Sequence, residues 1–138
     1  MFRSITEVSW LGVLLATVVN FIFGGFYFGI VIAKMYSYAM GRENEPKTKP
    51  SNLMIAGPAV CGLFVSLTSG VLIKTLNIQT LSGGLLFGAI VGIGYLIPMT
   101  MTIAINPNFP RPFYYTAINA PYFLVSSLVT CTIVAIVH

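Results

Sequence analysis

Residues 10–33 read WLGVLLATVVNFIFGGFYFGIVIA, a run without a single Asp, Glu, Lys, Arg or His. About 20 apolar residues suffice for a helix to cross the ~30 Å hydrocarbon layer of a membrane. Three further runs of this kind follow, at residues 53–73, 81–105 and 116–137. Because lipid offers backbone amides no hydrogen-bond partner, each run should be helical. The sequence therefore predicts an all-α, polytopic membrane protein: one integral domain, 1–138, with a bundle of four transmembrane helices, the first spanning about 10–36.

The composition points the same way. Of the 138 residues, 57% are hydrophobic and 7% are charged, and the mean hydropathy is +0.90, whereas a soluble domain carries about a quarter charged residues. The runs also lack the two-residue alternation of outer-membrane barrel strands. The first run follows Arg3, as a secretion signal would, but it is too long and no small-residue cleavage site ends it. We keep it as a spanning helix.

Basic residues predict the orientation. Five of the seven fall in the two connections that share one side of the membrane: Lys34, Arg42, Lys47, Lys49 and Arg111. Arg3 and Lys74 lie on the other side. Short loops rich in Lys and Arg stay in the cytoplasm, so we expect both termini on the non-cytoplasmic side, and a bacterial inner membrane in preference to an organelle membrane. The net charge of +4 is scattered along the chain, which does not indicate nucleic-acid binding.

Small residues recur at every fourth position on each predicted helix. The rows are Gly12, Ala16, Asn20 and Gly24, with Gly25, Gly29 and Ala33, on the first; Gly62, Ser66 and Gly70 on the second; Gly84, Gly88 and Gly92 on the third; and Ser127, Cys131 and Ala135 on the fourth. In lipid, close approach through small residues supplies the attraction between helices. The rows either pack the helices of one chain together, or one of them, foremost the all-glycine row of the third helix, faces another subunit.

Two amides, Asn20 and Asn119, are the strongest polar groups inside the runs. An unpaired amide costs several kcal/mol in hydrocarbon, while an interhelical hydrogen bond contributes only about 0.6–2 kcal/mol. One interpretation is structural: the amides bond to each other or to hydroxyls. The other is a polar track through the membrane, to which hydroxyl side chains would contribute: Thr100, Thr102, Ser126 and Thr130.

Catalytic, metal-binding and cofactor-binding residues are not found. The only histidine is His138, and the acidic residues Glu7, Glu43 and Glu45 lie outside the runs, so general acid–base chemistry lacks a group to tune. The two cysteines, Cys61 and Cys131, sit in mid-run as small apolar residues would. We therefore predict that the protein is not an enzyme and has no cofactor.

The stretch NPNFPRPFYY, residues 106–115, forms a stiff corner between the third and fourth runs. Its three prolines end the third helix, and its aromatic residues suit the headgroup zone. Arg111 has three interpretations: pairing with a lipid phosphate, capping helix carbonyls, or a site for a substrate or partner. The interfacial anchors that we predict are Trp10, Lys34, Tyr36, Arg111, Tyr114 and Tyr115.

A weak repeat links the two halves of the chain. KPSNLMIAGP, residues 49–58, is similar to RPFYYTAINAP, residues 111–121: each begins with a basic residue and a proline and has a second proline about a turn inside the helix. Two related helical hairpins would explain this, as in transporters with parallel repeats, although prolines near a helix start also occur for capping reasons alone.

GGFYFGIVIAKMY, residues 24–36, resembles the first-helix motif of the small four-span membrane protein family catalogued as domain of unknown function seventeen sixty-one. The motif has glycine, an aromatic pair, glycine, proline, apolar residues, then lysine and an aromatic; the matching residues are Gly24, Tyr27, Phe28, Gly29, Lys34 and Tyr36. Trp10, NPNFPRP and the stretch from Asn119 to Tyr122 also fit. Ile30 stands where the motif has its proline, so the sequence does not decide whether the first helix bends at this position. The resemblance implies four helices in a membrane and no known activity.

Two functional hypotheses follow. The first is a non-catalytic membrane protein that acts by helix packing, as a homo-oligomer or an accessory subunit of a larger complex, with membrane lipids, itself or other membrane proteins as partners. The second is a small oligomeric channel or carrier for a weakly charged solute. An excess of glycine rows favours the first. The absence of a carboxylate inside the runs disfavours proton-coupled transport.

Overall fold

The computed structural model describes residues 7–46 and 49–137. Arg3, Lys47 and His138, on which parts of the sequence analysis depend, lie outside these residues. Four helical spans are long and apolar enough to cross a membrane: Trp10–Val31, Asn52–Thr75, Leu81–Ala104 and Pro112–Ile136. The described part of the chain contains no strand. The predicted all-α fold with four membrane spans is confirmed.

The described residues form eight helical elements, of which all but Ala33–Ala39 belong to the spans. These are α2 (Trp10–Phe26), η1 (Tyr27–Val31), α3 (Ala33–Ala39), α4 (Asn52–Thr75), α5 (Leu81–Val91), η2 (Gly92–Leu96), α6 (Ile97–Ala104) and α7 (Pro112–Ile136). The hydroxyls of Ser9, Ser51 and Thr80 cap the starts of α2, α4 and α5 by accepting a hydrogen bond from the backbone N–H three residues on. Local sequence thus sets where three of the four spans begin.

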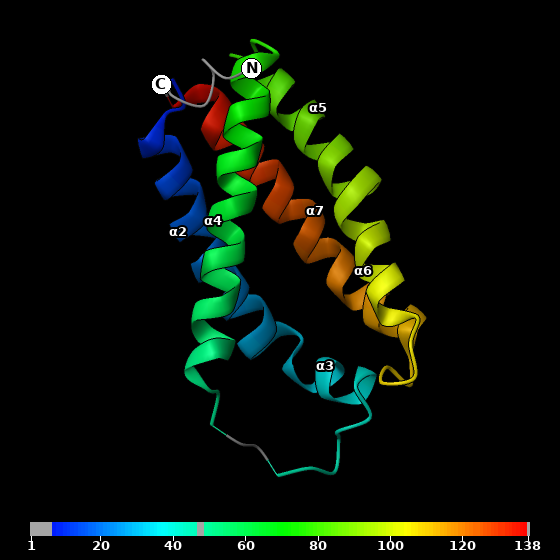
Figure 1. Cartoon of the computed structure of the whole chain (residues 1–138). Coiled ribbons are helices and arrows are strands. Elements are labelled where there is room, and N and C mark those ends of the chain that lie inside the picture. Colours follow the sequence, from blue (N-terminus) through cyan, green and yellow to red (C-terminus); the bar gives the residue numbers. More distant parts are fainter. Residues whose placement is uncertain (1–6, 47–48, 138) are drawn as a thin grey trace.

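The first helix differs from the expected single rod to Tyr36. Residues 27–31 are π-helical, so that the Ile32 N–H donates to the Tyr27 carbonyl five residues back, at 2.9 Å. Ile32 itself leaves the helical conformation (φ −110°, ψ 8°), and α3 turns away from the axis of α2 (Figure 1). The family's proline is absent, and the wider π turn provides the bend in its place.

The fourth helix also begins earlier than expected, at Pro112 instead of residue 116. Proline at the first helical position sacrifices no hydrogen bond, because that N–H has no partner within the helix. Phe113, Tyr114 and Tyr115 therefore belong to the first turn of α7 and not to the preceding connection.

Helix α7 is the centre of the fold. It packs against α2, α3, α4, α5, η2 and α6, and the main packing partner of α5 is α7 and not α4. Figure 1 shows α7 running behind α4 and beside the α5–α6 span. The small buried core lies along α7, where Cys131, Val134 and Ala135 meet Ala16 and Ile73.

The all-glycine row of the third span faces α7. A Cβ added to Gly88 would lie 2.7 Å from the Ser127 carbonyl oxygen and 2.8 Å from the Leu128 Cα. One added to Gly84 would lie 2.9 Å from the Thr132 Cα, and one added to Gly92 would meet the Ser127 hydroxyl oxygen and lie 3.2 Å from the Leu124 Cα. The two backbones are in direct contact, so this row is used within the chain and not between subunits.

Substitutions at two glycines of this span test that contact. Gly88→Ala should lower the free energy of unfolding by about 1–3 kcal/mol, because the new methyl group must push two backbones apart. Gly94→Ala is the matched control, since a Cβ at Gly94 meets nothing within 4 Å. Thermal unfolding in detergent, followed by circular dichroism, measures the difference. Equal loss in both variants would contradict the close packing of α5 on α7.

Candidate functional site

A buried amide joins the first span to α7. Asn20, 6% exposed, donates through Nδ2 to the Thr130 hydroxyl at 2.6 Å and to the Ala16 carbonyl of its own helix at 3.0 Å. This is the hydroxyl-bonded arrangement that the structural interpretation describes. The Asn20 Oδ1 atom is buried without a hydrogen-bond partner.

Several other polar side chains of the spans bond to the preceding turn of their own helix, whereas the Thr132 hydroxyl oxygen is buried without a hydrogen-bond partner. Asn119, 2% exposed, donates to the Tyr115 carbonyl at 2.6 Å, so the two amides do not bond to each other. Thr100 and Thr102 donate to the Leu96 and Pro98 carbonyls at 2.8 and 3.0 Å. Side chains that bond to the preceding turn are not arranged to pass a solute along, which gives the polar-track interpretation little support.

An aromatic layer surrounds the π turn. The rings of Phe23, Tyr27 and Phe28 lie 5.5, 5.8 and 4.8 Å from the ring of Tyr122 on α7. The Tyr27 hydroxyl donates to the Ile118 carbonyl at 2.8 Å. A Cβ at Gly24 would lie 3.0 Å from the Tyr122 hydroxyl oxygen, so this glycine makes room for the ring.

Three of the family-like residues, Gly24, Tyr27 and Phe28, therefore meet Tyr122, a residue of the resemblance for which the sequence predicts no role. The i, i+4 spacing of Phe23 and Tyr27 was the available signal, because residues at this spacing share a helix face. That α7 faces them was not readable from the sequence.

A second cluster holds α3 against the start of α7. The Arg111 guanidinium lies 3.7 Å from the centroid of the Tyr38 ring and donates to the Tyr38 carbonyl in the last turn of α3. Its Nη2 is 3.3 Å from a Glu43 carboxylate oxygen. We call Arg111, Tyr38 and Glu43 the clasp. Of the three interpretations of Arg111, carbonyl capping agrees best with these contacts.

The remaining predicted anchors sit at the two ends of the bundle. Trp10 is 55% exposed at the start of α2, and Lys34 is exposed at the start of α3. The ring of Tyr36 is 5.6 Å from Tyr115, and the ring of Tyr38 is 5.3 Å from Tyr114. The tyrosines thus also pack α3 on α7, in addition to the interfacial role that their position predicts.

The charge of Glu43 is stabilised in the folded state. A hydrogen bond from its own backbone lowers the pKa of this carboxyl group, and the nearby Arg111 guanidinium lowers it further. Glu45 forms a separate pair with Arg42 at 3.9 Å, between side chains that are 61% and 65% exposed. Such exposed pairs contribute little to stability.

Hollows of two kinds occur on the surface of the described residues. One, of about 270 Å³, lies at the end of the bundle where α2 begins and α7 ends, the terminal end, and is lined by both polar and apolar side chains. The other, of about 450 Å³, is an apolar groove between α4 and the third span, lined in part by Phe64, Leu72, Phe87 and Tyr95. No group of three or more His, Cys, Asp or Glu side chains that could hold a metal ion occurs among the described residues.

Comparison with known proteins gives one family match, which extends over nearly the whole chain. A family model described as "Protein of unknown function (DUF1761)" matches residues 11–135. No curated protein and no solved structure matches the chain. The match covers all four spans, the aromatic layer and the clasp.

We predict that the clasp holds α3 against the start of α7 less firmly at low pH. Because the pKa of Glu43 is lowered on folding, the stabilisation is complete above its unfolded value of about 4.5 and is lost as the pH falls through the lowered value. Spin labels on cysteines introduced at Met35 and Asn108, in a cysteine-free background, should give a broader distance distribution on acidification. Glu43→Gln should give the same broadening at neutral pH.

Glu45→Gln is the matched control for this measurement, since it removes an acidic residue from the same loop without touching Arg111. We expect it to leave the neutral-pH distribution as in the unmodified chain. An unchanged distribution in Glu43→Gln would show that the carboxylate does not hold α3.

Proposed function

Because the chain belongs to the family of proteins of unknown function DUF1761, whose model covers residues 11–135, we propose its function from its own geometry: it is a non-catalytic integral membrane protein that self-associates through α4. The resemblance seen in the sequence is confirmed by this match. Family membership supplies no activity, so the proposal rests on which surfaces the fold leaves uncovered.

The observation that carries the proposal is the uncovered first half of α4. All four buried residues of this helix, Ser66, Ser69, Gly70 and Ile73, lie in its second half, and none of residues 52–65 is buried. A Cβ added to Gly62 meets nothing within 4 Å, and one at Gly57 meets only Leu53 of the same helix. Half of this candidate transmembrane helix thus contains no buried residue.

Its composition suits a second helix better than lipid alone. Residues 52–65 carry no charge, and Gly57 and Cys61 form a small-xxx-small pair of the kind that lets helix backbones approach in a membrane. Cys61 is exposed. Most homo-oligomers are two-fold dimers in which one surface patch meets itself. A second copy that contributes its own α4 is therefore the occupant we propose.

The non-catalytic part of the proposal rests on the sequence. No Asp, Glu, Lys, Arg or His lies within the four apolar runs, and the buried amides donate to groups within the chain. The alternative of a channel or carrier has less support, because these side chains are committed to their own helices or to Thr130.

The two native cysteines provide a direct test. Cys61 is exposed on α4, whereas Cys131 is buried against the core. Mild oxidation of native membranes with copper phenanthroline should therefore produce a disulfide-linked dimer through Cys61, because the two-fold axis brings the two copies of this residue together. Denaturing electrophoresis without reductant measures the dimer.

Three variants act as controls. Cys131→Ser should keep the dimer and Cys61→Ser should abolish it, while Gly62→Leu should weaken it by obstructing the approach of the helices. Gly94→Leu adds equal bulk at another open glycine and should have no effect. A monomer under all conditions would exclude this interface, and solute flux above that of empty vesicles would favour the carrier.

We also propose that the end bearing both termini faces away from the cytoplasm, in a bacterial inner membrane. Lys34, Arg42, Lys49 and Arg111 belong to α3 and to the connections at the opposite end, and Lys74 is the one basic residue of the described chain at the terminal end. The positive-inside rule supports this orientation.

Membrane-impermeant maleimide tests the orientation. In a cysteine-free background of intact cells, a cysteine introduced at Gln79 should be labelled, because this exposed residue lies at the terminal end. A cysteine at Asn108, at the opposite end, should be labelled only after the membrane is opened. The reverse pattern would invert the topology.

A further inference from the structure

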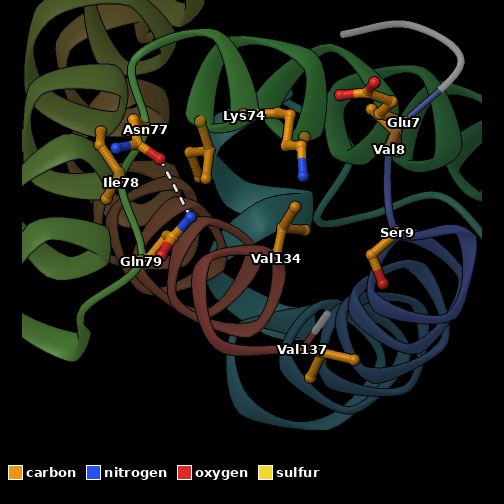
Figure 2. Close-up of a pocket in the computed structure, with 11 residues that line it drawn as sticks. Glu7, Val8, Ser9, Lys74, Asn77, Ile78, Gln79, Val134 and Val137 are labelled. Atoms are coloured by element: carbon orange, nitrogen blue, oxygen red, sulfur yellow. Dashed lines mark hydrogen bonds between the residues drawn. The ribbon is translucent and has the colours of Figure 1, made fainter.

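The hollow at the terminal end has an apolar floor. Val8, Ile73 and Val134 line it and are 6%, 3% and 6% exposed. Val8 and Val134 both approach Gly70, where an added Cβ would lie 3.2 Å from Val134 Cγ1 and 3.4 Å from Val8 Cγ1. The walls come from the segment before α2, the end of α4, the following turn and the end of α7 (Figure 2). Four separate parts of the chain thus form one cavity of about 270 Å³.

The rim is polar and carries both signs of charge. Figure 2 shows the Lys74 amine pointing into the space above Val134, with the Glu7 carboxylate and the Ser9 hydroxyl on the neighbouring wall. Asn77 and Gln79 complete the rim, joined by a 3.0 Å hydrogen bond from Gln79 Nε2 to Asn77 Oδ1. A cation, an anion and neutral hydrogen-bonding groups therefore surround an apolar floor.

The backbone preorganises this rim. Asn77 has a positive φ of 54°, the left-handed conformation that ends many helices. Its N–H donates to the Lys74 carbonyl at 3.2 Å, and the Ile78 N–H donates to the Ile73 carbonyl at 3.0 Å. These two bonds form a Schellman motif, which fixes the turn that carries Asn77 and Gln79 beside the last turn of α4.

The position of Lys74 matches the depth of lipid headgroups. Lys74 is the penultimate residue of the span Asn52–Thr75, and lysines near span ends reach the interface. Its ammonium offers three donors to a phosphate. The Glu7 carboxylate disfavours a purely anionic ligand but accepts hydrogen bonds from a primary ammonium.

We propose that this cavity binds a phosphoethanolamine headgroup, the phosphate on Lys74 and the primary ammonium beside Glu7, presented by a phospholipid of the leaflet at the terminal end. The apolar floor accommodates the methylene groups next to the phosphate. A choline headgroup lacks the N–H donors for Glu7, and a glycerol headgroup lacks the compensating positive charge. The inference is independent of self-association through α4.

Lipid binding to the full-length protein tests the proposal. The protein is purified in mild detergent, and its retention of phosphatidylethanolamine, phosphatidylglycerol and phosphatidylcholine is compared by native mass spectrometry. The unmodified chain should retain phosphatidylethanolamine preferentially. Lys74→Gln should weaken this binding about tenfold, equivalent to ~1.4 kcal/mol, and Lys74→Arg should keep it. Lys34→Gln, which removes an exposed charge at the opposite end, should leave it unchanged.

The Glu7→Gln variant distinguishes the contribution of the ammonium group to binding from that of the phosphate. It should reduce the preference for phosphatidylethanolamine over phosphatidylglycerol to about one, because the ammonium loses its charged partner while the phosphate keeps Lys74. Equal retention of all three lipids by the unmodified chain, or undiminished binding by Lys74→Gln, would overturn the proposal. Free phosphoethanolamine that binds as tightly as the lipid would overturn the membrane source of the ligand.

Discussion

The backbone contact between the third span and α7 is the constraint on which the rest of the bundle depends. Gly84, Gly88 and Gly92 bring α5 and η2 so close to α7 that a side chain at any of these three positions would collide with α7. In a membrane no hydrophobic effect holds helices together, so this approach and the few interhelical hydrogen bonds must supply the attraction. With α7 at the centre, α2 and α4 pack on its other faces.

The two ends of the bundle differ in structure: one is closed by α3 and the clasp, and the other has a cavity. Residues 27–31 bend the first span, Tyr27 bonds to α7, and α3 is turned toward the clasp, where Arg111 meets protein groups. The terminal end has instead a cavity whose rim is set by the turn after α4. The π turn and the turn after α4 therefore position the clasp and the cavity, the two features with polar groups at the ends of the bundle.

The exposed surface of α4 indicates where a further helix could pack. The first half of α4 contains no buried residue, although its small residues permit a close neighbour. Spans one and three each contain a π turn, and spans two and four each contain a proline in the helix interior, Pro58 and Pro121, while span three has Pro98 at the start of α6. This recurrence agrees with the weak repeat between the two halves of the sequence.

The sequence by itself determined the four spans, because apolar length and the absence of charge depend on no other part of the chain. It also identified Gly88 and Asn20 as packing residues and the family from the motif around Tyr27. The tertiary structure decided which faces meet: that the all-glycine row contacts α7, that Arg111 lies over Tyr38, and that Lys74 shares a cavity with Glu7. Every helix face here is apolar or small, so hydropathy does not distinguish a face toward lipid from one toward protein, and only the packed arrangement does.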